Sequence, residues 1–241
     1  MSERFEHFVP PAEEDMTVSP AKPCDAKEQL EFFTQKFLGK VLKGWESKKE
    51  MVKELFNRFG NSLEVEDIDS YTVISHLEHL NKLPENLVKQ MINKGIKIKI
   101  GYKGMLGLSD DEELRTQCPR GWGGQDWSKV AGGWNYKRKT AYAGKGESGS
   151  SSLVLHEVGH GAGYLLNLDN DPVLIKAHNR LYKKLSSYFQ QDGPGGFAGR
   201  QEFLAESFAD YFQLSKKRFI KRYDIDWYAF LEQTVNNISN I

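Results

Sequence analysis

The chain has 241 residues, of which 39% are hydrophobic and 12% aromatic, and its 33 basic residues balance its 33 acidic ones. This length can bury a core without disulfides, and this content of large apolar side chains argues against a chain that is disordered throughout. The net charge of zero argues against a dedicated nucleic-acid-binding protein, because such proteins carry a basic excess that neutralises phosphates.

The N-terminal segment MSERFEHFVPPAEEDM lacks a basic stretch followed by an apolar core, so we expect no cleavable signal peptide. The sequence has no run of about 18 apolar residues, so we expect no membrane span. The protein is then either cytoplasmic or exported by a route that reads no cleaved signal. Cys24 and Cys118 lie far apart in the sequence and are expected to be reduced thiols.

The first part of the chain predicts a tail followed by helices. Residues 1–25 contain repeated prolines and an acidic cluster but no hydrophobic period, which predicts a disordered tail. Apolar residues then recur at spacings of three and four, the period of one helix face. Ser47 is suited to capping the second helix and Pro84 to the first turn of the fourth. The expected helices are 26–43, 48–59, 70–81 and 84–94.

The hydrophobic period changes to two after Gly95. Ile96, Ile98 and Ile100 alternate with lysines, which predicts a strand over 96–102 with one buried face. Many helices and few strands predict an α+β fold. The remaining segments are expected to be irregular over 103–131, strand-like over 134–143, a flexible linker over 144–152, and helical over 153–166, 171–188, 201–215 and 224–240.

The strongest functional signal is the segment His156-Glu157-Val158-Gly159-His160. Positions four apart lie on one face of a helix, so the two histidines can present their imidazoles to one metal ion. Glu157 flanks that face, close enough to take a proton from water at the metal. The apolar flanks predict a buried helix, and unpartnered polar groups inside one cost free energy. Three glycines of this helix indicate either tight packing or room for a substrate: Gly159, Gly161 and Gly163.

A catalytic zinc site needs a third protein ligand and one open position. Glu202, Glu206 and Asp210 recur every four residues in a predicted helix and therefore project near one line. The spacing leaves two assignments open. Either Glu202 is the ligand and Glu206 orients a histidine, or Glu206 and Asp210 fill these roles.

The segments VLHEVGHGAGYLLN and EFLAESFADYF resemble the catalytic domain of anthrax lethal factor and its relatives, which include the secreted Pro-Pro endopeptidases. The resemblance implies a mainly helical, zincin-type metalloprotease domain with a small sheet before the HExxH helix. It covers residues 26–241, with a helical N-terminal part 26–82 and a catalytic part 83–241. It also implies that Glu202 is the third zinc ligand and that Glu206 supports the ligands from outside.

One position departs from the family. The family places a tyrosine seven residues before the ligand glutamate, where its hydroxyl stabilises the developing oxyanion. Gly195 occupies that position here, or Ala198 when the following Gly-Arg pair is aligned, so neither alignment supplies a hydroxyl. Removing one oxyanion donor typically slows an enzyme about 100- to 1000-fold. The candidate replacements are Tyr188, Tyr211 and Tyr164.

The resemblance also implies a substrate that lies extended beside an edge strand just before the zinc helix. The matching stretch is 133–143, whose basic residues would put positive charge near the cleft and whose aromatic residues would add flat apolar surface. The alternative is a solvated edge strand protected by its Lys and Arg residues. The candidate substrate-contacting residues are Trp134, Tyr136, Lys137, Arg138, Lys139 and Tyr142.

These features predict a Zn²⁺-dependent endopeptidase of the gluzincin type, which combines HExxH with a glutamate and acts on a protein or peptide. A bacterial toxin or effector that works inside another cell is one form of this prediction. Two alternatives stay open. One is a zinc-binding relative with weak or no activity that binds a peptide or protein partner, and the other is a small adaptor with a chance HExxH.

Overall fold

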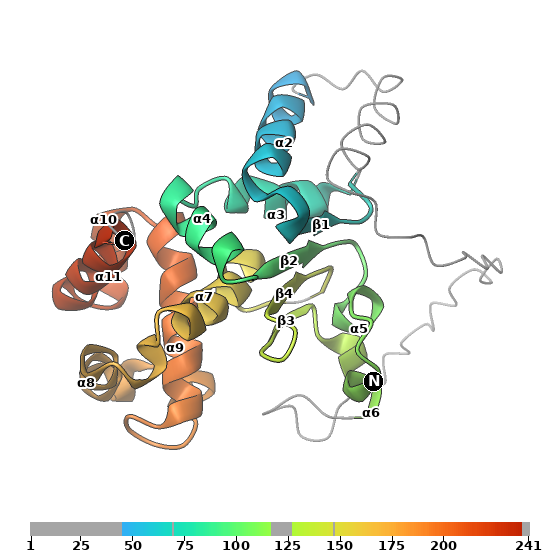
Figure 1. The fold of residues 1–241 in the computed structure, drawn as a ribbon. Coiled ribbons are helices and arrows are strands. Elements are labelled where there is room, and N and C mark those ends of the chain that lie inside the picture. The colour runs from blue at the N-terminus through green and yellow to red at the C-terminus, as the bar shows by residue number, and fades with distance from the viewer. Residues whose placement is uncertain (1–44, 69, 117–126, 147, 238–241) are drawn as a thin grey trace, which may run out of the picture.

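The structure is a computed structural model that describes residues 45–68, 70–116, 127–146 and 148–237. The predictions for the tail 1–25 and the helix 26–43 lie outside these residues, as do both cysteines. The described chain forms helices around one small sheet (Figure 1), which confirms the predicted α+β class. None of the helices in the described part is long and apolar enough to cross a membrane.

The sheet has four strands in the order β1-β2-β4-β3. The first three in this order run parallel, and β3 pairs antiparallel with β4. All four precede the HEVGH segment in the sequence, as predicted. Their bounds are β1 Leu63–Val65, β2 Lys97–Ile100, β3 Gly132–Asn135 and β4 Thr140–Ala143.

Strand β2 shows why the alternating sequence forms a strand. Ile98 and Ile100 are buried on the core side, whereas Lys99 points to the other face. The Lys99 ammonium lies 3.7 Å from the Glu64 carboxylate and 3.3 Å from that of Glu66. These ion pairs join β2 to the neighbouring edge strand β1, which the sequence analysis did not predict because it has only three residues.

The predicted edge strand 134–143 is a hairpin, so this prediction is wrong in its middle. Residues 136–139 form the turn, and Lys139 adopts a left-handed backbone with φ 49°. The Asn135 side chain explains the reversal, since its Oδ1 accepts the Arg138 N–H at 3.0 Å and its amide donates to Asp111 at 2.9 Å. The turn contains three basic residues, and its amino-acid composition alone did not distinguish it from a strand.

Helices α2, α3, α4 and α7 form one core with the sheet, to which Phe208 and Ala209 also contribute. Their bounds are α2 Trp45–Phe59, α3 Tyr71–Leu80, α4 Glu85–Asn93 and α7 Leu153–Leu165. Ser47 lies inside α2, so the predicted cap is wrong, whereas Pro84 is the N-cap of α4, one position before the predicted first turn. The predicted irregular region also contains two short helices, α5 Met105–Leu108 and α6 Glu112–Thr116.

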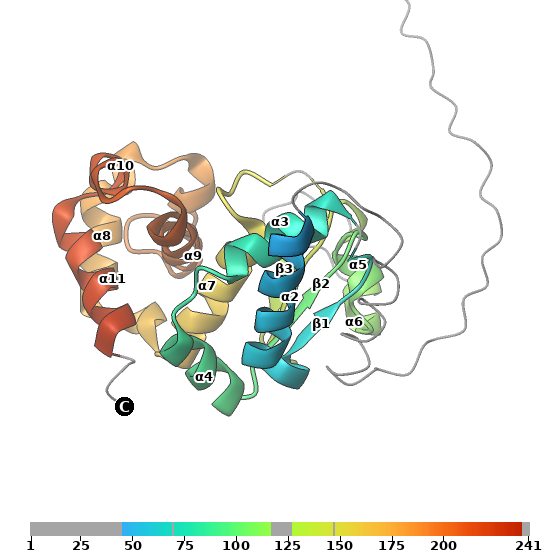
Figure 2. The same cartoon turned by 90° about the horizontal axis from the view of Figure 1, so that it is seen from above.

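The remaining helices gather on the other side of the molecule, opposite α2 and the sheet (Figure 2). They surround a second core that contains Phe203, Phe219 and Trp227. The predicted helix 171–188 ends at Leu181 and continues as short 3₁₀ turns, and the predicted helix 224–240 is preceded by the unpredicted α10. The bounds are α8 Pro172–Leu181, α9 Phe197–Gln213, α10 Lys216–Arg222 and α11 Ile225–Asn237.

Helices α7 and α9 connect the two cores by packing closely against each other. A Cβ placed on Gly159 of α7 would lie 2.9 Å from Ala205 Cα and 3.0 Å from the Ala205 carbonyl oxygen of α9. Helix α7 begins at Ser152, whose hydroxyl accepts the Leu155 N–H, and it ends before Asn167, which has a left-handed backbone. The glycine at position 159 therefore allows the close approach of two backbones.

We expect the substitution Gly159→Ala to destabilise the fold, because overpacking costs about 1–3 kcal/mol while the gain in helix propensity returns only about 1 kcal/mol. Urea denaturation of the metal-free protein measures the change in free energy of unfolding. Gly149→Ala is the matched control, since nothing lies within 4 Å of a Cβ added there. Equal stability of the two variants would contradict the tight contact between α7 and α9.

Candidate metal centre

The contact between α7 and α9 brings three potential metal ligands together. His156 and His160 lie one turn apart on α7, and Glu202 lies opposite them on α9. Glu202 Oε2 is 3.2 Å from His156 Nε2 and 3.4 Å from His160 Nε2. In the described residues this is the one group of three or more His, Cys, Asp or Glu side chains whose ligand atoms all lie within 4.8 Å of one another.

The donor set and its spacing fit a zinc ion. Two histidine nitrogens and one carboxylate oxygen are a common set for a catalytic zinc, which keeps its fourth position open. Ligand atoms about 2.0–2.1 Å from a tetrahedral ion lie roughly 3.3 Å apart. The two distances from Glu202 match this separation, so the three side chains need little rearrangement to hold an ion.

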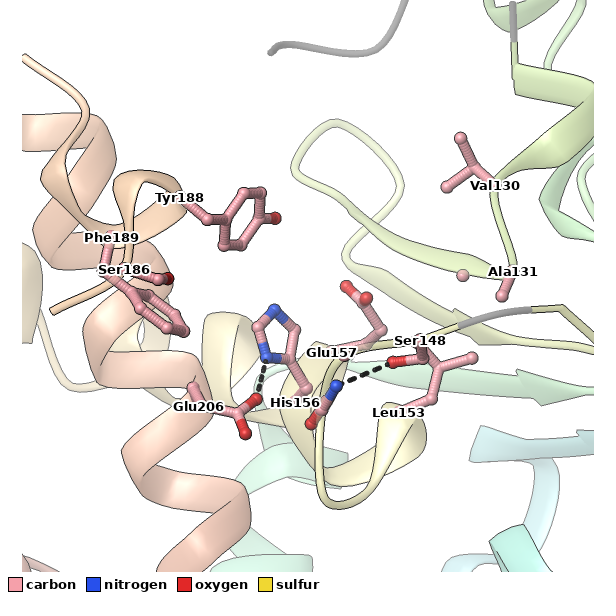
Figure 3. Close-up of a pocket in the computed structure, with 13 residues that line it drawn as sticks. Val130, Ala131, Ser148, Leu153, His156, Glu157, Ser186, Tyr188, Phe189 and Glu206 are labelled. Carbon is pink, nitrogen blue, oxygen red and sulfur yellow. Dashed lines mark hydrogen bonds and ion pairs between the residues drawn. The ribbon is translucent and has the colours of Figure 1, made fainter. Parts of the chain in front are cut away.

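Glu206 orients one of the histidines from outside. Its Oε2 lies 3.1 Å from His156 Nδ1, which leaves Nε2 of the same ring to face Glu202 (Figure 3). Asp210, the third carboxylate in the row, instead contacts Arg222 and Tyr223. Of the two predicted assignments, this geometry favours the one in which Glu202 is the ligand and Glu206 the orienting group.

Groups of opposite charge contact one another inside this buried cluster. Burial lowers the pKa of His156, but the hydrogen bonds that its ring donates to Glu202 and Glu206 outweigh that effect and raise the pKa to about 10. Burial raises the pKa of Glu202, but its hydrogen bonds to His156 and His160 outweigh that effect and hold the pKa well below its usual range. The metal-free protein thus holds an imidazolium and a carboxylate where a metal would bind.

Glu157 lies at the opening of the site. Its side chain lines two cavities, one of about 320 Å³ and one of about 270 Å³, and His156 lines both of them as well. Burial raises the pKa of its carboxyl group, and the electrostatic interaction with the two histidines only partly offsets this effect. A buried carboxylate with a raised pKa beside a metal site is a stronger base than one in water.

The three candidate oxyanion donors lie in different places. Tyr188 lines both cavities, and Figure 3 shows its hydroxyl directed into the open space over His156 and Glu157. Tyr164 is half-exposed at the end of α7 and lines neither cavity. Tyr211 packs against Phe212, Phe219 and Tyr228 in the second core. Of the three, only Tyr188 faces the space where a substrate carbonyl would lie.

A buried histidine anchors the turn that carries Tyr188. His178 of α8 has Nε2 at 2.7 Å from the Phe189 carbonyl oxygen, and its Nδ1 accepts the Gly195 N–H at 3.1 Å. The second bond requires an unprotonated Nδ1, so Nε2 carries the proton and donates it. Burial lowers the pKa of His178, which favours this neutral form. The sequence analysis did not single out this residue, because a lone histidine on a helix carries no pattern.

Of the six candidate substrate-contacting residues, two line a cavity beside the histidines and four do not. Trp134 and Tyr136 line the second cavity, and the Tyr136 hydroxyl accepts a hydrogen bond from Gln201 at 2.9 Å. Tyr142 lies in β4, inside the sheet, and is buried under α5, so its expected place on an edge strand is wrong. The turn residues contact the α6 region rather than either cavity: Lys137 pairs with Glu113 and Arg138 with Asp111. Lys139 instead donates to the Lys94 carbonyl oxygen.

Zinc uptake should displace a proton, because a metal ligand nitrogen must be unprotonated. His156 is protonated at pH 7 in the metal-free protein, so we expect binding of Zn²⁺ at this pH to release about one proton per chain. We also expect the affinity to fall as the pH is lowered, since protons then compete more strongly. Calorimetric titration in two buffers of different ionisation enthalpy measures the release, and a binding enthalpy that is independent of the buffer would contradict the raised pKa.

Comparison with known proteins agrees with this architecture. The solved structure of the Pro-Pro endopeptidase PPEP-2 from Paenibacillus alvei shares the fold, with a TM-score of 0.52 and 20% sequence identity over 74% of this chain and 96% of that chain. A search of curated proteins found no match. The family profile described as "Anthrax toxin lethal factor, N- and C-terminal domain" matches residues 41–234. This match spans most of the chain and confirms the resemblance seen in its motifs, so the chain belongs to the anthrax toxin lethal factor family.

Proposed function

We propose that the protein is a zinc-dependent endopeptidase of the gluzincin type that cleaves a peptide bond in a protein or peptide. The observation that carries this proposal is the buried group of His156, His160 and Glu202, with Glu157 beside it at the opening of two cavities. Family membership and the fold shared with a Pro-Pro endopeptidase support it.

His156, His160 and Glu202 would hold the ion. Zn²⁺, when bound, supplies Lewis acidity that polarises a carbonyl and makes a water molecule more acidic. Glu206 contacts Nδ1 of His156, so Nε2 of the same ring would be the nitrogen that holds the ion. Such outer partners fix the orientation of a ligand ring and raise its basicity.

Glu157 has the place and the basicity of a general base. Its raised pKa brings it closer to neutral pH, where proton transfer from water is most efficient. The carboxyl group that accepts this proton lies at the cavity opening and can later pass it to the leaving amine. Tyr188 faces the same space and can donate a hydrogen bond to the carbonyl oxygen as negative charge develops on it.

The edge of the sheet offers a place for an extended substrate. Strand β3 is the last strand of the sheet, and within the described residues no further strand pairs with its outer edge. A peptide could add to this edge by main-chain hydrogen bonds, with side chains entering the neighbouring cavities. Trp134 and Tyr136, whose ring centroids are 5.9 Å apart, would give apolar surface beside the third ligand.

The second candidate is a zinc-binding relative with little activity that binds a peptide or protein partner. Its support is that neither Gly195 nor Ala198 can supply the hydroxyl expected from the family. A toxin or effector role concerns the place of action rather than the chemistry, and it is compatible with both candidates.

Glu157→Gln should keep the metal and abolish cleavage, since it removes the base without touching the three ligands. A peptide library incubated with the zinc-loaded parent and variant, with products read by mass spectrometry, tests this expectation. We expect cleavage by the parent and a loss of about 1000-fold or more in the variant. A parent that binds zinc but cleaves no peptide would support the second candidate, and cleavage by the variant would contradict the role of Glu157.

Tyr188→Phe should lower kcat by about 100-fold with little change in KM, because the hydroxyl acts on charge that develops only in the transition state. Tyr211→Phe is the matched control, since its ring lies in the second core away from both cavities. Activity on the best library peptide provides the measurement. Equal rates for the parent and Tyr188→Phe would assign the donor to another group.

A further inference from the structure

Asp210 is fully buried and has no part in the proposed chemistry. It lies one turn beyond Glu206 on α9, with its Oδ2 2.8 Å from the Tyr223 hydroxyl, which donates to it, and 2.8 Å from Arg222 Nη1. Taking a carboxylate out of water is costly unless its partners are well placed. These partners come from the end of α10 and the residue after it, so they tie the second core to the row of carboxylates on α9.

The Arg222 guanidinium lies between two carboxylates. While Nη1 pairs with Asp210, Nη2 lies 3.8 Å from Glu206 Oε1. The same Oε1 also accepts the Ser151 N–H at 3.3 Å, and the other oxygen of Glu206 contacts His156 Nδ1. The two oxygens of Glu206 therefore have separate partners, one on the side of the metal ligand and one on the side of Arg222.

This arrangement limits how the Glu206 carboxylate can turn. Rotation about its terminal bond would move Oε2 away from His156, and it would also separate Oε1 from Ser151 and Arg222. Arg222 is itself fixed by Asp210, which Tyr223 holds in turn. A guanidinium suits this position because its planar fork can face two carboxylates at once, whereas an ammonium is a point charge.

We propose that Arg222, held in place by Asp210 and Tyr223, is a positioning residue that fixes Glu206 and thereby orients His156 toward the metal. This inference rests on the proposed function, because it takes His156 as a ligand. If Arg222, Asp210 and Tyr223 only joined α10 to α9, replacing Arg222 would change the zinc affinity equally with and without Glu206.

A double-mutant cycle separates the two roles. The dissociation constant for Zn²⁺ is measured by competition with a chromophoric chelator at neutral pH for the parent, Arg222→Met, Glu206→Gln and the double variant. We expect Arg222→Met to weaken binding about tenfold, the low end of the range for partners of metal ligands. In the Glu206→Gln background the same change should alter binding less than about twofold, because Arg222 then has no carboxylate to act through, and residues of one ion-pair network are not additive.

Further variants control for folding and for charge. Arg180→Met is the matched control, because it breaks another arginine–carboxylate pair, 2.7 Å from Asp224, that does not touch Glu206. It should leave Zn²⁺ binding unchanged. Arg222→Lys should recover part of the affinity. Tyr223→Phe should weaken binding less than Arg222→Met does, since it loosens Asp210 alone. Arg222 is half-exposed, so we expect its variants to fold. Thermal unfolding of each metal-free variant checks that the variant is folded.

Two outcomes would overturn the inference: unchanged binding by Arg222→Met, or an equal loss in both backgrounds, which would mean that Arg222 acts through the fold alone. The result also separates this inference from the proposed function. A parent without Zn²⁺ affinity would overturn both, whereas a parent that binds Zn²⁺ and cleaves peptides, with Arg222→Met unchanged, would overturn only the role of Arg222.

Discussion

The close packing of α7 on α9 is the constraint on which the rest of the site depends. The absence of a side chain at Gly159 lets the two backbones approach, and the approach places Glu202 against His156 and His160. Helix α7 packs into the first hydrophobic core and α9 contributes buried residues to both cores, so the potential ligands lie where the cores meet.

The buried charged groups that run from His156 to Asp210 each have a partner of opposite charge. Positive and negative groups alternate from the site outward: His156, Glu206, Arg222 and Asp210 follow one another in contact. A bound cation would replace the proton that His156 carries without it. The row of carboxylates on α9 thus has different partners along its length, with Glu202 facing the two histidines and Asp210 facing the end of α10.

The sequence predicted the parts of the site that follow from helix periodicity. Residues four apart share a face on any helix, so HEVGH and the row of carboxylates were visible before the fold. Periodicity could not show which carboxylate meets the histidines, because that depends on how α9 packs on α7. Arg222 carried no signal, since it reaches Glu206 from a separate helix. The hairpin was missed for a similar reason: one Asn135 side chain makes the turn, while the composition stays that of a strand.

The zinc content of the chain, measured by elemental analysis of protein purified without added metal, tests the central claim most directly. The account predicts about one zinc per chain in the parent and almost none in His160→Ala and Glu202→Ala. Zinc that survives Glu202→Ala but not Glu206→Ala would move the third ligand one turn along α9. A parent that holds no zinc, even after zinc is added back, would contradict the account.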